Sequence, residues 1–150
     1  MRTRITVFFV LISAVLLQAF ITSGPTVAHF ILYNDSNKEI PLYISISNPG
    51  KANSVKTYHQ IIKPGMQEFE AGKFEKNTYL VSIESDNGKV SLSKTVTLDA
   101  DRWIIINYTS RDSVSIVKKY GFLDTNSLKK IDGMYTGLDM FSETRRPPNL

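Results

Sequence analysis

The sequence predicts an all-β protein: a small antiparallel β-sandwich of about eight short strands, preceded by an N-terminal signal or anchor helix and followed by a short C-terminal helix and a tail. Three observations support this prediction. Most of the chain alternates apolar and polar side chains in steps of two, which is the strand period. Turns rich in Asn, Asp, Pro and Gly separate these runs. No long helical period lies between them.

The first 28 residues have the layout of a secretory signal peptide or of an uncleaved membrane anchor. Arg2 and Arg4 precede an apolar run from Ile5 to Ile21, and Gly24-Pro25 then breaks the helix. Ala28 suits a processing site, which favours cleavage, although a run of this length also suits an anchor. In both cases the two arginines stay inside, so the domain is expected outside the cytoplasm: periplasmic, secreted or anchored through residues 5–21.

The clearest strand runs from Val90 to Leu98. Its apolar side chains share one face with Lys94, and its Ser and Thr side chains occupy the other, as in a half-buried strand. Another alternating run, Tyr79–Glu84, precedes it. Asn87-Gly88 lies between the two runs and tolerates the positive φ of a type I′ turn, so the sequence predicts a hairpin here.

The other strands follow from the same alternation. Trp103–Tyr108 is apolar on both faces, which predicts a central strand with Trp103 anchoring the core. The remaining strands are expected at Phe30–Tyr33, Pro41–Ser47, Val55–Ile62, Gln67–Ala71 and Val114–Tyr120.

The C-terminal part has a different pattern. Thr125 or Asn126 can cap a short helix, Ser127–Ile131, that ends before a glycine. No sustained period follows from Met134 to Leu150, and its end, with two arginines and two prolines, reads as a mobile tail.

The sequence therefore divides into a leader (1–28), a β-sandwich domain (29–120) and a C-terminal extension (121–150). In size the sandwich is immunoglobulin-like or transthyretin-like, which is an analogy of fold and does not imply function.

Composition excludes several classes of function. The chain has 18 Lys and Arg, or 16 without Arg2 and Arg4 of the leader, against 14 Asp and Glu, so the domain has a small positive net charge. No run of basic residues is longer than two. Nucleic-acid binding needs a concentrated basic face, so it is not expected. The chain has no cysteine, which excludes disulfides, thiolate metal sites and cysteine nucleophiles. No nucleophile elbow or phosphate-binding glycine loop occurs.

The absence of catalytic motifs predicts a non-enzymatic binding protein of the envelope or of the secreted set. Tyr43 and Tyr58 are expected on strand faces opposite the apolar ones. Exposed tyrosines on a flat sheet bring apolar area at low entropic cost, and they suit a sugar ring or a protein partner. The alternative is that both residues are ordinary strand tyrosines with a wet tip. The expected partner is an envelope protein or a glycan.

The two histidines give an alternative function. If cleavage follows Ala28, His29 becomes the N-terminus, and its amine and imidazole can bind copper together with His59. In this order of features the chain resembles the histidine-brace copper proteins, the lytic polysaccharide monooxygenases and their non-catalytic relatives, which are exported β-sandwiches cut directly before His. The resemblance implies a copper-binding protein with His29 and His59 as ligands. Otherwise no cofactor is expected.

Overall fold

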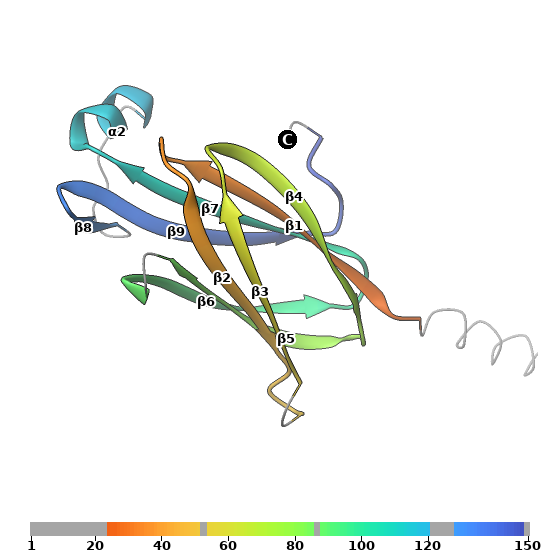
Figure 1. Ribbon diagram of the computed structural model, residues 1–150. Coiled ribbons are helices and arrows are strands. Elements are labelled where there is room, and N and C mark those ends of the chain that lie inside the picture. Colours follow the sequence, from red (N-terminus) through yellow and green to blue (C-terminus); the bar gives the residue numbers. More distant parts are fainter. Residues whose placement is uncertain (1–23, 52–53, 86–87, 121–127, 149–150) are drawn as a thin grey trace, which may run out of the picture.

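In a computed structural model of the chain, residues 24–51, 54–85, 88–120 and 128–148 are described. They form two β-sheets packed face to face and one short helix (Figure 1). The elements are β1 (Thr26–Asp35), β2 (Ile40–Ser47), β3 (Val55–Ile62), β4 (Gly65–Phe74), β5 (Asn77–Ser85), β6 (Val90–Leu98), β7 (Arg102–Arg111), α2 (Ser113–Tyr120), β8 (Lys129–Ile131) and β9 (Met134–Glu143).

The two sheets confirm the predicted all-β sandwich. The five-stranded sheet has the order β4-β1-β7-β9-β8, and the four-stranded sheet has the order β3-β2-β5-β6. β1 and β7 run parallel, and the other neighbouring strands are antiparallel, so the antiparallel sandwich contains one parallel pair. β7 lies in the middle of its sheet, as its apolar residues on both faces predict.

The core lies between the sheets and is built from alternate side chains of the strands. In β2, Leu42, Ile44 and Ile46 point inward and are at most 1% exposed, as the two-residue period predicts. They belong to one buried cluster with Phe30 and Ile104 of the other sheet. Burying an aliphatic side chain of this size contributes about 1.5–3 kcal/mol, so this cluster is the main source of stability in a chain without disulfides.

The predicted β5–β6 hairpin is confirmed by the antiparallel register from Ser85 and Val90 outward. Gly88 has a φ of 81°, which suits the expected turn, while Asn87 lies outside the described residues. Lys94 keeps its predicted place on the apolar face of β6. Its ammonium reaches the sheet edge, where it donates to the carboxylate of Asp139 and to the carbonyl of Met140.

β1 extends the predicted strand Phe30–Tyr33 at both ends and begins at Thr26. Thr26 is 3% exposed and Ala28 is fully buried, and both pair with β4. The N–H of Val27 donates to the carboxylate of Asp101 at 2.8 Å. A cut after Ala28 would therefore remove a buried, paired end of the sheet.

The prediction of a strand at Val114–Tyr120 is wrong, because residues 113–120 form the helix α2. The cause lies at its start. One carboxylate oxygen of Asp112 accepts the N–H of Ser115 at 2.8 Å, and the other accepts the hydroxyl of Ser115 at 2.6 Å. This N-cap satisfies a donor that the first turn would leave unpaired, and local capping thus outweighs the β-branched composition. The same hydrogen bonds hold the pKa of Asp112 below its usual value, and the bond from the hydroxyl of Ser115 contributes most to this shift.

The prediction of a C-terminal helix at Ser127–Ile131 is also wrong for Lys129–Ile131, because these residues form the strand β8. The expected capping residues, Thr125 and Asn126, lie outside the described residues. β8 and β9 are joined by the two-residue turn Asp132-Gly133, whose φ angles are 49° and 82°. A type I′ turn requires positive φ at both central residues, and Asp-Gly is a preferred pair for it.

β9 is a strand that the sequence pattern does not predict. It pairs with β7 from Tyr135 to Glu143. Met140 is 2% exposed in the core, and Leu138 packs against it, whereas Phe141 points outward and is 44% exposed. Residues 134–143 therefore belong to the sandwich.

The residues after β9 cross the outer face of the five-stranded sheet, as the blue segment in Figure 1 shows. Arg146 donates to the carboxylate of Glu68 at 2.7 Å, and Glu68 lies on β4, beyond β7 and β1. Three strand spacings amount to about 14 Å, which three extended residues and an arginine side chain can span. The tail that the sequence predicts to be mobile is thus tethered at Arg146.

An ion cluster ties the ends of β1 and β7 to α2. Asp35 is a buried carboxylate with a side chain that is 2% exposed. It accepts hydrogen bonds from the guanidinium of Arg111 and from the ammonium of Lys119, the latter at 2.6 Å. The ammonium of Lys119 also lies 5.7 Å from the centre of the Tyr33 ring. Paired charges are the condition under which a carboxylate can be buried.

Candidate functional site

The outer face of the four-stranded sheet carries an exposed pair of stacked aromatic rings. Tyr43 lies between Leu42 and Ile44, which point into the core, so its ring points outward, and it is 44% exposed. In the register of β2 and β3 it stands opposite His59. The two rings stack with centroids 4.4 Å apart and planes 7° apart. Aromatic pairs contribute about 0.5–1.5 kcal/mol beyond buried area, so the stack holds the ring of Tyr43 in place.

Hydroxyl groups dominate the rest of this surface, which we call the Tyr43 face. On the far side of Tyr43 from His59 stands Glu84 of β5. Ser93 donates to Ser82 at 2.9 Å across β5 and β6. The outward positions of the four strands are Pro41, Tyr43, Ser45, Ser47, Val55, Thr57, His59, Ile61, Thr78, Leu80, Ser82, Glu84, Ser91, Ser93, Thr95 and Thr97.

None of these outward strand positions carries Lys or Arg. Each Ser and Thr hydroxyl is both a donor and an acceptor. The Tyr43 face therefore offers a flat aromatic platform beside neutral hydrogen-bonding groups, and Glu84 is the one acidic side chain among these outward strand positions.

The prediction that Tyr58 also lies on an outer face is wrong. Its side chain packs against the core cluster, and its ring lies 6.4 Å from that of Phe30 and 5.6 Å from that of Phe69. Its hydroxyl donates to the carbonyl of Ala71 at 2.7 Å. Burial raises the pKa of Tyr58 above its usual value. Tyr58 thus joins β3 to β4, and only Tyr43 of the predicted pair is available to a partner.

The structure does not bring His29 and His59 together. His29 alternates with the buried Ala28 and Phe30, so it points to the outer face of the five-stranded sheet, opposite to the face that carries His59. Its ring stacks on Trp103 at 4.7 Å. Trp103 is half-buried on that outer face, so the expectation that it anchors the core is wrong.

In the part of the chain that the structure describes, no three His, Cys, Asp or Glu side chains form a group that could hold a metal ion. The backbone nitrogen of His29 lies inside β1. The three-nitrogen copper site is therefore not assembled in this structure.

Sequence reasoning identifies Tyr43 but misses the groups around it. The signal for them was present, because Ser45 and Ser47 alternate with the apolar residues of β2, as the serines and threonines of β6 do in theirs. What the sequence cannot give is the register that places Glu84 and His59 on either side of Tyr43.

Over the described ranges, no helix combines the length and the apolar character needed to cross a membrane. The apolar run at residues 5–21 lies outside these ranges. Comparison of the chain with protein-family models, with curated proteins and with solved structures finds no match. Its function has therefore to be inferred from the residues described above.

Proposed function

We propose that this chain is an exported, non-enzymatic β-sandwich protein that binds a glycan or a protein partner of the envelope through the Tyr43 face. The observation that carries the proposal is the exposed ring of Tyr43, held by His59 on a flat surface of hydroxyl groups whose strand positions carry no Lys or Arg. Export is supported by Arg2 and Arg4 before the apolar run at residues 5–21.

The side chains of the Tyr43 face favour a glycan over a folded protein. Serines and threonines occupy most of its outward positions, whereas protein interfaces are depleted in Ser and enriched in aromatic residues, Met and Arg. The C–H face of a sugar can lie on the ring of Tyr43 while its hydroxyls exchange hydrogen bonds with serines, threonines and Glu84.

The strand order bears on the two fold analogies. In an immunoglobulin constant domain the first and second strands share one sheet. Here β1 and β2 lie in different sheets. This order argues against the immunoglobulin-like analogy.

The binding proposal is tested with the full chain, a panel of neutral oligosaccharides and an extract of envelope proteins. We expect Tyr43→Ala to lose most of the binding, because the platform is removed, and Tyr43→Phe to keep it. Tyr135→Ala, a tyrosine of β9 on the other sheet, is the matched control and should bind as the unchanged chain does. If the unchanged chain retains no oligosaccharide and no specific protein, or if Tyr43→Ala retains as much as the control, the proposal is wrong.

Export is tested separately by the intact mass of the protein from the soluble and membrane fractions of a secretion-competent host. A soluble species that has lost the apolar run, or a membrane-bound species that keeps it, supports export. A cytoplasmic species that begins at Met1 contradicts it. Because Thr26 and Ala28 are buried in β1, we expect a cleaved product to retain both residues.

A further inference from the structure

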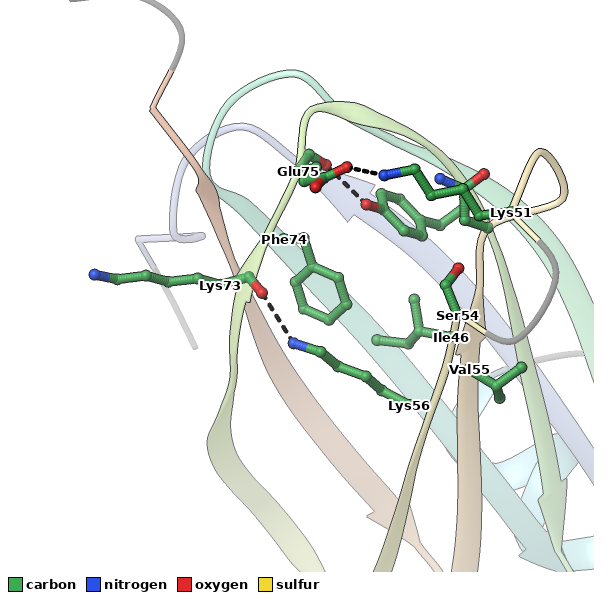
Figure 2. A pocket seen from close by; sticks show the side chains of 10 residues that line it. Ile46, Lys51, Ser54, Val55, Lys56, Lys73, Phe74 and Glu75 are labelled. Carbon is green, nitrogen blue, oxygen red and sulfur yellow. Dashed lines mark hydrogen bonds and ion pairs between the residues drawn. The ribbon is translucent and has the colours of Figure 1, made fainter.

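A cavity of about 390 Å³ lies between the two sheets at one end of the sandwich (Figure 2). One wall is formed by residues of β2 and β3 and, between them, by Asn48, Lys51 and Ser54, and the other wall by the end of β4 and the start of β5. Ile46, Phe74 and Tyr79 supply apolar surface. The volume falls within the range of about 300–1,000 Å³ that is typical of small-ligand sites.

Lys56 places a positive charge at the wall of this cavity. Its ammonium lies 4.0 Å from the centre of the Phe74 ring and donates to the carbonyl of Lys73 at 2.9 Å. An ammonium has three donors, so capacity remains. No carboxylate among the described residues forms an ion pair with Lys56. Figure 2 shows the side chain of Lys73 pointing away from the cavity, so it does not add its charge there.

Two further groups in the lining have unused hydrogen-bonding capacity. The hydroxyl of Ser54 is buried and has no partner among the described residues. Asn48 is 6% exposed, and its Oδ1 accepts the N–H of Gly50 at 2.9 Å. This hydrogen bond fixes the orientation of the side-chain amide and does not use its Nδ2 donors. A buried donor without a partner is unfavourable, so the hydroxyl of Ser54 favours a ligand that brings acceptor oxygens. The Nδ2 of Asn48 is a second donor that the same ligand can use.

The remaining polar groups of the lining are occupied. Lys51 and Glu75 form an ion pair, and the hydroxyl of Tyr79 donates to the carbonyl of Glu75 at 2.9 Å (Figure 2). The charges of Lys51 and Glu75 cancel, which leaves Lys56 to set the sign of the site. A positive, donor-rich cavity with aromatic surface is complementary to an anion with an apolar body.

We propose that this cavity binds a small organic carboxylate. Its carboxylate accepts hydrogen bonds from Lys56, its apolar part lies against Phe74 and Ile46, and Ser54 and Asn48 donate to further oxygens of the ligand. The site is separate from the Tyr43 face, so it does not depend on the proposed function. No sequence motif marks it, because its walls come from segments that only the fold brings together.

The probe is benzoate, titrated into the full chain in a neutral detergent and followed by NMR. We expect a dissociation constant of about 1 mM, which is typical of a fragment of this size. Benzamide, which has the same shape without the charge, should bind several-fold more weakly, and benzylamine should not bind.

Lys56→Met tests the role of the ammonium, because methionine keeps the apolar stem over Phe74. It should weaken benzoate binding about fivefold to tenfold, since a charge-assisted hydrogen bond is lost. Lys73→Met is the matched control and should leave binding unchanged. Tyr43→Ala should also leave it unchanged, which separates this site from the Tyr43 face.

The proposal is overturned if benzoate does not bind at about 20 mM, if benzylamine binds as well as benzoate, or if Lys56→Met and Lys73→Met bind it equally. A melting temperature of Lys56→Met that matches the unchanged chain excludes misfolding as the cause of any loss. Asn48→Asp keeps the oxygen that accepts from Gly50 and adds a negative charge, so it should abolish benzoate binding independently of Lys56.

Discussion

Replacing Asp35 by Asn tests the ion cluster that joins β1, β7 and α2. The carboxylate is 2% exposed, whereas the side chains of Arg111 and Lys119 are 33% and 37% exposed. A hydrogen bond to a charged group contributes about 1.5–3 kcal/mol, so the two bonds contribute about 3–6 kcal/mol in all. Because both cations can turn towards water when the charge is removed, we expect the lower part of that range, a loss of about 3–4 kcal/mol.

The measurement is urea unfolding of the unchanged chain and of Asp35→Asn, with thermal unfolding as a second readout. For a chain of this size each kcal/mol lowers the melting temperature by about 2–4 °C, so we expect a fall of about 5–15 °C. The matched control is Asp139→Asn, which removes an exposed ion pair with Lys94 and should change stability by less than about 0.5 kcal/mol.

Either of two results would refute this reasoning. One is an Asp35→Asn variant as stable as the unchanged chain, which would mean that the cluster contributes nothing beyond what its burial costs. The other is equal losses for Asp35→Asn and Asp139→Asn, which would mean that burial does not matter. Lys119→Met should fall between these limits, because Arg111 still pairs with the carboxylate.

Three further changes have clear expected outcomes. Gly133→Ala should lower the unfolding free energy by about 1–2 kcal/mol, because an L side chain is strained at a φ of 82°; unchanged urea stability would contradict the type I′ turn. Asp112→Ala should reduce helical circular dichroism by uncapping α2, and Asp112→Asn should restore most of it. Burial raises the pKa of Tyr58 and of Tyr79, so each holds its proton more tightly when folded. The contribution of these two tyrosines to stability should be constant below about pH 10 and be lost as the pH rises through the raised values; an equally steep fall in Tyr58→Phe would exclude Tyr58 as a cause.

The sequence predicts a strand correctly where the two faces of that strand differ clearly in hydrophobicity. β6 is predicted correctly because its outward positions are all Ser or Thr. β9 is missed because Thr136 and Ser142 point inward while Tyr135 and Phe141 point outward, so no alternation of hydrophobicity is visible. α2 is missed because a single capping carboxylate, that of Asp112, decides its structure against a β-branched composition.

The clarity of the apolar–polar alternation also explains why Tyr43 is placed correctly and Tyr58 is not. Tyr43 is placed correctly because its neighbours in β2 alternate cleanly. In β3 the apolar Val55 and Ile61 mark the outer face, where they are 59% and 57% exposed, and Tyr58 lies on the inner one. A prediction that takes Val55 and Ile61 as core residues assigns every side chain of β3 to the wrong face of the sheet. A shift of the strand by one residue produces the same error. The edge position of β3, where burial is incomplete, removes the signal that would have corrected it.

The place of β1 between β4 and β7 has a consequence for how the protein folds. Val27 and Asp101 are hydrogen-bonded across 74 positions of the chain, and Asp35 and Arg111 across 76. On a ribosome, one edge of β1 stays unpaired until most of the chain has emerged. Such distant pairings fold slowly, on the scale of milliseconds to seconds, since a long loop must close before any contact forms. Until β7 arrives, the exposed edge of β1 is the part of the nascent chain most open to pairing with a neighbouring copy.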